Sequence, residues 1–433
     1  MKPFKLILVL LCISQTCLSQ KDFVQQKNGR LYIHDKAYRF IGTNYWYGIY
    51  LPLIKEEERG IGRLRKELDF LRQQGITNLR ILAGAEGTGK ILSNYRVGPP
   101  LQITKGVFDT TVLFGLDVLL DEMSKRNMKA VIFFSNNWEW SGGFLQYLNW
   151  NGVISDSVLQ NKMEWEAMRD IISQFYTCEP CKTDYKMQVE LILNRTNSVN
   201  GKRYIDDATI MSWQIANEPR PMRPSANAAY KEWIANVSAY IKSIDKKHLV
   251  SIGHEGETGT QDFDLYRQLH SDTNIDYLTI HTWPKNWGWM RADSMKKDFS
   301  KVKELTSSYL GKHMKLAYQL KKPLVVEEFG FPRDNMQFDP ETATSLRDKY
   351  YSYLFSQFTH PKNEDQYSRI IAGMNFWSFN GIARPIPGQR FWKTGDDYMG
   401  DPPMEEQSLY GVFDTDTSTW NVIQKHIKVL QQK

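Results

Sequence analysis

A chain of 433 residues and 50.6 kDa is long enough for about three average domains, although a single α/β barrel also reaches this size. Hydrophobic residues make up 41% and charged residues 24%, which excludes wholesale disorder and allows a large core. The net charge of +6 is small, and runs such as residues 55–59 mix both signs, so nucleic acid is not an expected partner. Aromatic residues reach 13%, enough to build a core and still stack on a flat, half-apolar ligand.

Residues 1–19 have the layout of a secretory signal peptide. Two lysines precede an apolar run over residues 6–13, and small residues then lead to the predicted cleavage site. The run is too short to span a bilayer, and no later stretch reaches the roughly 20 apolar residues that a spanning helix needs. Lipid anchoring through Cys17 is an alternative, but Thr16 is a poor fit before a lipid-modified cysteine. We therefore expect a secreted or periplasmic protein of residues 20–433.

Short apolar strands alternate with amphipathic helices along the rest of the chain. Strand patterns at 30–34 and 38–42, joined by an Asp35-Lys36 turn, predict a hairpin leading into a first strand. Further strands are predicted at 77–82, 129–134, 208–215, 248–252, 277–280, 323–326 and 370–376. Helices are predicted at 63–74, 112–127, 159–176, 227–244, 294–320, 341–358 and 421–430, with an interruption of the fifth left open.

Eight strands, most of them followed by a helix, predict a (β/α)8 TIM barrel. Their apolar runs lack alternation with polar residues, which is typical of parallel strands covered on both faces. A doubly wound open sheet is the alternative, but it would normally carry a glycine-rich phosphate loop after the first strand, where residues 42–46 read GTNYW. No repeat or low-complexity linker divides the chain. We expect one α/β domain over 20–433, with long βα loops and a short N-terminal β-hairpin.

Two cysteines, Cys178 and Cys181, remain after removal of the signal peptide. A redox-active pair would need a short βαβ context, and a zinc site would need two more ligands nearby, and the sequence offers neither. A local structural disulfide formed in an oxidising compartment is the favoured interpretation.

Glutamates follow the fourth and seventh predicted strands, where a barrel places its active-site face. Glu218 lies in residues 213–220 (WQIANEPR), and Glu328 lies in residues 325–330 (VVEEFG). One such carboxylate alone would usually be a helix cap or an ion-pair partner. Two of them from different strands can both reach the barrel axis, and hydrolysis of a glycosidic bond needs such a pair. We expect their carboxyl groups to converge within about 5 Å.

With these motifs the sequence resembles glycoside hydrolase family 5, in the clan whose catalytic glutamates follow strands four and seven. Residues 213–220 look like the family's acid/base motif, and residues 326–330 look like its nucleophile motif. The fuller match is with its β-mannanases, the mannan endo-1,4-β-mannosidases. These have counterparts, in the same order, to residues 42–48, 136–138, 204–207, 253–256, 281–284, 375–378 and 400–403. The likeness runs from about residue 23 to the C-terminus and implies cleavage of β-1,4-mannosidic bonds in mannan, glucomannan or galactomannan.

The resemblance implies a role for each polar residue around the two glutamates. Glu218 would be the general acid/base and Glu328 the nucleophile of a double displacement with retention of configuration. Arg80 matches the arginine that keeps the nucleophile ionised, and Asn217 matches the residue that bonds the sugar 2-hydroxyl. His281 matches the histidine near the acid/base. Glu218 must be protonated at rest, so we expect its pKa to be raised.

Tryptophans near strand ends are candidate sugar platforms. Trp377, after the eighth strand, matches the family platform beneath the sugar at the cleavage point. Trp283 stands where many relatives carry a tyrosine that donates to the nucleophile, and an indole N–H can still donate. Other candidates for substrate contact are Trp46, Asn137, Trp138, Trp287 and Trp289. Glu327 should point to the opposite side from Glu328, as neighbours in a strand do, so we interpret it as structural.

Other functions fit the sequence less well. No two histidines have metal-ligand spacing near an acid and no Gly-x-Ser-x-Gly elbow appears, which disfavours metal and serine hydrolases. We expect no cofactor, no metal, and a monomer that binds a polysaccharide or oligosaccharide. A β-1,4-glucanase of the same clan is the alternative enzyme; Arg220 and residues 400–403 favour a mannanase by family likeness. A non-catalytic sugar-binding barrel is disfavoured because Glu218 and Glu328 are intact. Endo versus exo attack stays open.

Overall fold

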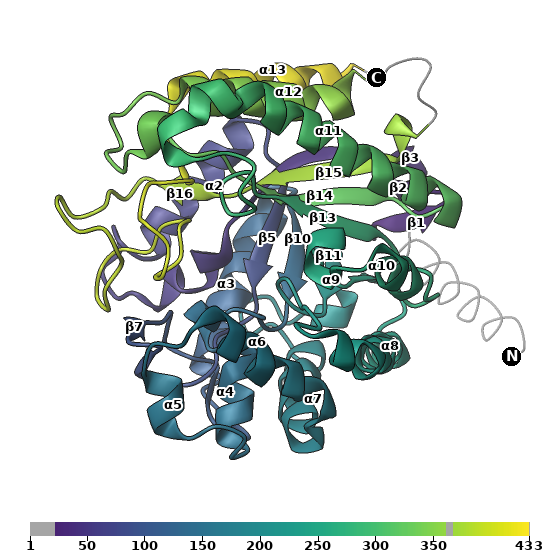
Figure 1. Ribbon diagram of the computed structural model, residues 1–433, viewed down its shortest axis with the longest axis vertical. Coiled ribbons are helices and arrows are strands. Elements are labelled where there is room, and N and C mark those ends of the chain that lie inside the picture. The colour runs from purple at the N-terminus through teal and green to yellow at the C-terminus, as the bar shows by residue number, and fades with distance from the viewer. Residues whose placement is uncertain (1–21, 361–366, 433) are drawn as a thin grey trace, which may run out of the picture.

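Eight parallel strands form the centre of the molecule (Figure 1). The computed structural model describes residues 22–360 and 367–432, so the predicted signal peptide lies outside the described residues. The strands are β4 (Phe40–Asn44), β5 (Asn78–Leu82), β10 (Lys129–Phe133), β11 (Ile210–Gln214), β12 (Leu249–Ser251), β13 (Leu278–Thr282), β14 (Leu324–Phe329) and β15 (Ile371–Phe376). Their order is β12-β11-β10-β5-β4-β15-β14-β13, and every pair is parallel. The first and last barrel strands, β4 and β15, are therefore neighbours, and the predicted (β/α)8 barrel is confirmed.

The seam between β12 and β13 is held by single hydrogen bonds instead of a ladder. The backbone N–H of Asp276 donates to the Val250 carbonyl at 2.8 Å, and the Asp276 carboxylate accepts from the Val250 N–H at 2.6 Å. Further along the strands, the His281 N–H donates to the Glu255 carbonyl at 3.0 Å. Because both ends of the seam are tied, residues that follow the eight strands share one opening.

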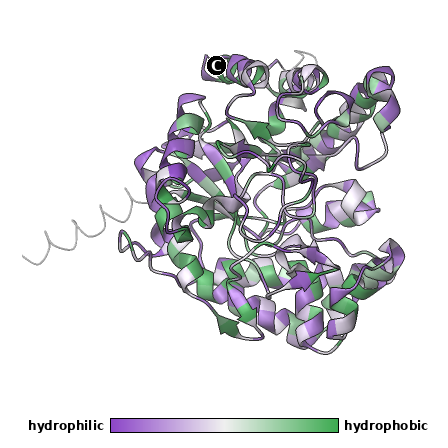
Figure 2. Ribbon diagram, turned by 90° about the vertical axis from the view of Figure 1, so that its left-hand side faces the viewer, coloured by the Kyte–Doolittle hydropathy of each residue, from purple (hydrophilic) through white to green (hydrophobic). Residues whose placement is uncertain are grey.

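Helices cover the outer side of the barrel (Figure 1). Those that follow the strands are α2 (Ile61–Gln73), α3 (Thr111–Lys125), α7 (Glu179–Leu193), α8 (Asn227–Ile244), α10 (Phe263–His270), α11 (Met295–Leu320), α12 (Ser345–Thr359) and α13 (Thr417–Gln431). The helix predicted at 227–244 is confirmed as α8, and α11 runs without interruption. Hydrophilic and hydrophobic residues lie side by side along the helices (Figure 2), as amphipathic helices on a core require.

The region between β10 and β11 differs most from the predicted elements. The helix predicted at 159–176 is split into α5 (Asp156–Gln160) and α6 (Trp165–Ser173), because Asn161 and Glu164 have extended backbone. Two helices, α4 (Gly143–Trp150) and α7, correspond to no predicted helix. The short helix α9 (Glu257–Thr260) lies after β12.

A small antiparallel sheet covers the N-terminal end of the barrel. It consists of β1 (Gln25–Lys27), β2 (Arg30–Ile33) and β3 (Lys36–Ala37). A hairpin is present as predicted, but its second arm is 36–37, and most of the predicted arm at 38–42 belongs to β4. Val24 and Leu31 of this region belong to a buried cluster with Val131, Met211 and Leu249 of the barrel strands. The functional site therefore has to lie at the opposite, C-terminal end, as in other barrels of this kind.

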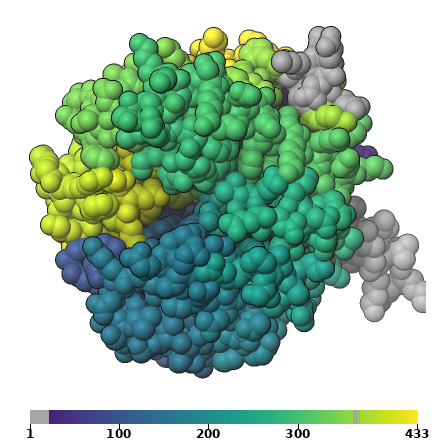
Figure 3. Space-filling model, in the orientation of Figure 1, coloured from purple at the N-terminus to yellow at the C-terminus, as the bar shows by residue number. Residues whose placement is uncertain are grey.

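The βα loops contain further short elements. Paired strands are β6 (Lys90–Ile91) with β7 (Asn94–Tyr95), β8 (Gln102–Thr104) with β9 (Val107–Phe108), and β16 (Phe379–Gly381) with β17 (Val412–Phe413). Short 3-10 helices cover Trp46–Ile49, Leu51–Leu53, Glu139–Ser141, Gln174–Thr177, Tyr204–Asp206, Pro224–Ala226, Ala292–Ser294, Asp334–Met336 and Ser368–Ile370. The loop between β16 and β17 spans residues 382–411 and borders the central hollow of the surface (Figure 3).

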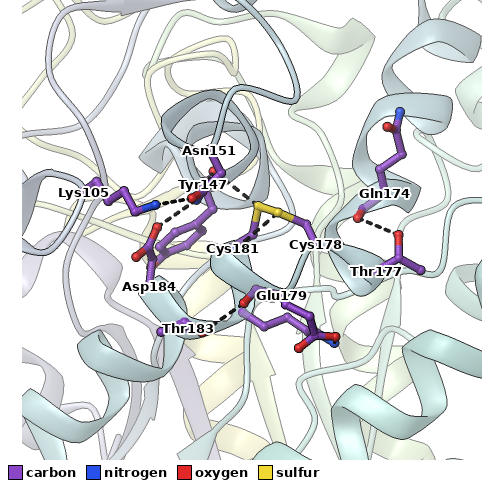
Figure 4. Close-up of a disulfide and its surroundings, with 11 residues drawn as sticks. Lys105, Tyr147, Asn151, Gln174, Thr177, Cys178, Glu179, Cys181, Thr183 and Asp184 are labelled. Atoms are coloured by element: carbon purple, nitrogen blue, oxygen red, sulfur yellow. Dashed lines mark hydrogen bonds and ion pairs between the residues drawn. A yellow bond between two sulfur atoms is a disulfide. The ribbon is translucent and has the colours of Figure 1, made fainter.

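The predicted disulfide between Cys178 and Cys181 is present at the start of α7 (Figure 4). Cys178 is the N-cap residue of this helix, and its sulfur accepts a hydrogen bond from the Cys181 N–H at 3.3 Å. The bond closes the first turn of α7, and the buried Cys181 sulfur lies 3.5 Å from the Tyr147 carbonyl oxygen of α4. Across residues 22–360 and 367–432, no helix combines the length and apolar character needed to cross a membrane.

Candidate active site

The ends of β11 and β14 bring the two glutamates to the barrel mouth. The Glu218 N–H donates to the Gly253 carbonyl at 2.9 Å, and the Asn217 N–H donates to the Ser135 carbonyl at 2.8 Å, so hydrogen bonding between neighbouring strands continues past β11. Glu218 has a φ of 47°, a left-handed conformation that is uncommon outside glycine and that clusters at functional sites. Both Glu218 and Glu328 are buried, at 6% and 3% exposure.

Three side chains converge at the centre of this opening. One oxygen of Glu218, one nitrogen of His281 and one oxygen of Glu328 all lie within 4.8 Å of one another. His281 Nδ1 is 2.5 Å from Glu218 Oε1 and 3.2 Å from Glu328 Oε2. The expected convergence of the two carboxyl groups within about 5 Å is therefore met.

Arg80 organises the floor of the site from β5. Its guanidinium donates to Glu328 Oε1, to Asn217 Oδ1 at 2.7 Å and to Asn44 Oδ1 at 3.1 Å. Its Nε donates to Gln214 Oε1 at 2.8 Å, so each nitrogen of this fully buried cation has a partner. Arg80 thus supplies the positive charge that an ionised Glu328 needs, and it orients Asn217 at the same time.

The direction of the Glu327 side chain differs from the sequence-based expectation. It does not point away from the barrel: its Oε2 accepts from Gln214 Nε2 at 2.6 Å and lies 3.7 Å from Arg80 Nε. The ladder between β13 and β14 shifts at this point, since Ile280 pairs with Val326 but His281 pairs with Glu328. One residue is therefore extra in β14, and a bulge of this kind lets two consecutive side chains face the same side.

The charges in the cluster depend on one another. Burial disfavours the charged form of His281, but the carboxylates of Glu328 and Glu218 outweigh it and raise the pKa of His281 to about 10. For Glu218 burial acts in the opposite sense, and the charge and hydrogen bond of His281 overcome it and lower the pKa to about 2. The expectation of a raised pKa for Glu218 is thus wrong for this arrangement, because the proton lies on His281, hydrogen-bonded to Glu218 Oε1.

A cavity of about 580 Å³ opens above these groups. Its wall includes Asn217, Glu218, Glu328, Trp138, Trp165, Trp283, Trp287 and Trp377. A volume of this size holds a few sugar rings, and the aromatic walls offer flat apolar surfaces to them. The expected cluster of tryptophans around the two glutamates is therefore present.

Each of the central tryptophans has a definite contact. Trp138 Nε1 donates to Glu218 Oε2 at 2.6 Å, and Trp283 Nε1 donates to Glu328 Oε2 at 3.3 Å, so Trp283 keeps the donor function considered for it. The ring of Trp377 is 6.0 Å from that of Trp283 and nearly perpendicular to it. Both catalytic candidates therefore receive an indole N–H bond from the cavity wall.

Three further candidates, like the fully buried Arg80 and His281, lie outside the cavity wall. Trp46 is buried beneath the 382–411 loop, where its Nε1 donates to the Gly400 carbonyl at 2.7 Å. Asn137 is also buried, and its Oδ1 accepts from the Arg220 N–H at 3.4 Å. Trp289 packs against Trp287, with ring centroids 5.1 Å apart. These positions support the site without lining it, because a strand-end aromatic can face a covering loop as well as the opening.

Several wall residues carried no sequence signal strong enough to single them out. Trp165 begins α6, is 42% exposed and stacks on Trp138 at 6.1 Å between ring centroids. Glu255 accepts both hydrogen bonds of a forked contact from Arg220, at 2.5 and 2.7 Å. Glu405 follows the 400–403 segment by two residues and lines the cavity beside Trp377. Of these three residues, only Glu255 lies inside a segment, residues 253–256, that resembles the family.

The central group of Glu218, His281 and Glu328 has donor atoms that a metal ion could use. The positive charges beside these atoms disfavour a metal cation. Arg80 already contacts Glu328, and a protonated His281 has no lone pair to offer. A divalent cation would have to displace that proton and lie beside a guanidinium. The residues present therefore favour proton transfer over metal binding.

A parallel barrel whose mouth holds two close carboxyl groups inside a tryptophan-walled cavity is the architecture of a glycoside hydrolase. Residues 21–433 match the family model described as GH family 5 beta-mannosidase-like. The chain belongs to this family, glycoside hydrolase family 5, and is an enzyme of the glycoside hydrolase class.

Individual relatives agree with this assignment. Mannan endo-1,4-beta-mannosidase 1 of Oryza sativa is 26% identical over 428 residues, which cover 93% of this chain and 87% of the relative. The solved structure of a glycoside hydrolase family 5 mannosidase from Rhizomucor miehei is 31% identical, with a TM-score of 0.84, and covers 95% of this chain and 98% of that one. An endo-1,4-beta-mannanase from the same fungus, 22% identical with a TM-score of 0.66, shares the fold and covers 95% of this chain and 100% of that one.

Proposed function

We propose that this protein hydrolyses β-1,4-mannosidic bonds in mannan, glucomannan or galactomannan with retention of configuration. The observation that carries the proposal is the approach of Glu218 and Glu328 oxygens to within 4.8 Å. Retaining enzymes hold their carboxyl groups about 5–5.5 Å apart, whereas inverting enzymes need about 6.5–9.5 Å to admit a water. Membership of the β-mannosidase-like family and the names of the relatives support mannose as the sugar.

The first step forms a covalent sugar–enzyme ester. A Glu328 oxygen attacks the anomeric carbon, the bond to the glycosidic oxygen breaks, and Glu218 delivers a proton to that oxygen. The proton between His281 and Glu218 Oε1 is positioned for this delivery. The two atoms are 2.5 Å apart, so the proton can move to Glu218 without any movement of heavy atoms. Trp138 holds the other oxygen of Glu218.

The second step releases the sugar. Once Glu328 is esterified its negative charge is gone, so a water on the opposite face can lose a proton to Glu218 and attack the anomeric carbon. The ester bond breaks and Glu328 leaves as a carboxylate beside Arg80. Asn217, held by Arg80 at 2.7 Å, lies beside the acid/base, where a sugar 2-hydroxyl would meet it.

The shape of the cavity favours attack near a chain end. Beyond Glu218 the cavity passes Trp165 and Arg220 into a second hollow of about 270 Å³, which leaves room for a leaving group of several sugars. On the Glu328 side it meets Met404 and Glu405 of the 382–411 loop. That loop is anchored by the Tyr398 hydroxyl, which donates to the Gly98 carbonyl on the loop after β5. We therefore propose that few sugars fit on the Glu328 side.

Chemical rescue separates the roles of the two glutamates. With azide, the Glu328→Ala variant should form the α-mannosyl azide from an activated mannoside, and the Glu218→Ala variant should form the β-mannosyl azide. Both variants should otherwise be inactive on mannan while remaining folded. Wild-type digests followed at once by proton NMR should show the β anomer first. Activity of either variant on mannan, or the α anomer first, would refute the mechanism.

Product sizes decide the substrate and the mode of attack. The purified chain should release reducing sugar from linear mannan and not from cellulose; the opposite result would support the β-1,4-glucanase alternative. Chain-end attack on mannohexaose should give mannose and mannopentaose as the first products. An even mixture of mannobiose, mannotriose and mannotetraose would instead show internal cleavage, as in the endo-acting relatives.

A further inference from the structure

Glu86 is a buried carboxylate on the loop after β5, outside the cavity wall. Its Oε1 accepts hydrogen bonds from Ser135 Oγ at 2.7 Å, Gln188 Nε2 at 3.0 Å and Tyr147 Oη at 3.2 Å. Its Oε2 accepts from the Gly143 N–H at 3.0 Å. None of these four donors carries a charge, so this carboxylate has no direct ion-pair partner among the groups that bond it.

The donors lie at both ends of one segment of the barrel mouth. Residues 135–143 leave β10 at Ser135 and enter α4 at Gly143, and Glu86 bonds both of these residues. The backbone of Glu86 adds a third tie, since its N–H donates to the Ser141 carbonyl at 2.8 Å. Glu86 thus ties both ends of the segment to the neighbouring loop, in addition to the backbone hydrogen bonds that Asn217 makes with Ser135 and Asn137.

This segment carries Trp138, whose Nε1 donates to Glu218 Oε2 at 2.6 Å. We propose that Glu86 is a positioning residue for the acid/base: by clamping Ser135 and Gly143 it fixes Trp138 against Glu218. The inference rests on the proposed role of Glu218. It assigns Glu86 no contact with substrate; Glu86 acts through the geometry of the segment above it.

Protonation of Glu86 would open one side of the clamp. Three donors face Oε1 and one faces Oε2, so a proton would be placed on Oε2, against the Gly143 N–H. Burial raises the pKa of Glu86 to about 7, although its hydrogen bonds act against this. The positioning effect should therefore be nearly complete at about pH 8, half lost at about pH 7 and weaker below it.

The expected pH dependence comes from Glu86 itself and not from the charged and titratable groups around it. Arg96 donates from Nη1 to the Glu86 backbone carbonyl at 3.0 Å and to Gln146, and it makes no bond to the carboxylate. Tyr50, Tyr147 and Tyr185 face it from other elements, and burial raises the pKa of each of them above the ordinary value for tyrosine. These hydroxyls stay neutral through the range in which Glu86 titrates.

The test is the Glu86→Gln variant of the full chain, assayed on two substrates. Mannotriose has a poor leaving group and needs the acid, whereas 2,4-dinitrophenyl β-mannoside does not. At pH 8 we expect kcat/KM on mannotriose to fall about 10- to 100-fold, the size of a small misplacement of a catalytic group. On the dinitrophenyl substrate it should fall less than about 3-fold, because the acid is not used.

The pH profile gives a second readout. In the wild type, kcat/KM on mannotriose should fall as the pH drops below about 7. In Glu86→Gln this fall should be absent. Equal losses on both substrates, or an unchanged pH profile, would overturn the proposal. Ser135→Ala removes one donor at the start of the segment and should show the same substrate dependence in smaller measure, which keeps the test available if Glu86→Gln does not fold.

Asp117 provides a matched control. It is equally buried and accepts from Arg195, Tyr204 and Ser198, but it lies on α3, outside the barrel mouth. Asp117→Asn should lower the melting temperature without a difference between the two substrates. If Glu218→Ala itself lost kcat/KM equally on both substrates, the proposed role of Glu218 would fail. That result is distinct from equal losses in Glu86→Gln alone, which would overturn only the role of Glu86.

Discussion

Replacing His281 by glutamine tests how the site holds its proton. In the wild type the carboxylates of Glu328 and Glu218 raise the pKa of His281 to about 10, so the shared proton stays bound into the alkaline range. Glutamine fills similar space and can still donate to Glu218, but it cannot carry the proton. In the variant, Glu218 alone has to hold it.

The expected change follows from the distance between the two carboxyl groups. The nearest oxygens of the two carboxyl groups lie within 4.8 Å, and two unit charges at that limit repel by about 3.5 kcal/mol at an effective dielectric constant of 20, which corresponds to a pKa change of about 2.5. Added to the ordinary value for a glutamate, this gives Glu218 a pKa of about 7 in the variant. The alkaline limb of kcat/KM should therefore move from near pH 10 in the wild type to near pH 7.

The assay is kcat/KM on mannotriose between pH 5 and 10, for wild type and His281→Gln. At pH 8 the variant should have lost about 10-fold relative to its plateau, since each pH unit above the pKa removes a factor of ten. Activity on 2,4-dinitrophenyl β-mannoside should not follow this limb. An alkaline limb that stays in place would refute the idea that His281 keeps the acid proton in the site.

Three further outcomes are expected. Trp377→Ala should lower kcat/KM by about 10²- to 10³-fold, far less than loss of Glu328, because the ring only supports the sugar; losses of equal size in steady-state kinetics would contradict this. Asp245→Asn should destabilise the fold by about 2 kcal/mol at pH 7, because the pKa of Asp245 is lowered to about 2, mainly by its bond to His248. That contribution is present above about pH 4 and is lost toward pH 2, so urea titrations of wild type and variant should converge on acidification. Replacing both cysteines of the Cys178–Cys181 disulfide by serine should cost at most about 2 kcal/mol, since the closed loop is short, and should leave kcat unchanged; a loss of activity at full folding would show that the bond shapes the site.

The fold could be predicted from the sequence because most of its elements have strong periodicity. The pattern over 227–244 predicts α8 with both ends correct, since its apolar residues recur at helical spacing throughout. Helix α7 has no predicted counterpart because it starts with Cys178, Glu179 and Pro180, residues that suggest a loop. Proline is well tolerated in the first turn of a helix, and Cys178 caps this one through its sulfur, a contact with little sequence signature.

The residues of the site and the approach of its two glutamates could be predicted from the sequence, but the direction of every side chain could not. Glu218, Glu328, Arg80 and His281 do meet, because each follows or belongs to a barrel strand. Trp46 has the same kind of position in the sequence, yet it faces the loop that covers it. The direction of a side chain at a strand end depends on the loop above it, and local sequence patterns do not specify that loop.

The bulge at Glu327 explains how so many charges are buried together. Arg80 and a protonated His281 carry two positive charges, and Glu218 and Glu328 carry two negative ones. Burial, opposed by Arg80 and His281 and assisted by the charge of Glu328, raises the pKa of Glu327. This direction favours uptake of a proton by Glu327, and protonation of Glu327 would leave the cluster without net charge, which lowers the cost of removing it from water. Because the bulge directs Glu327 inward, this carboxyl group bonds Gln214, which in turn accepts a hydrogen bond from Arg80 beside Glu328.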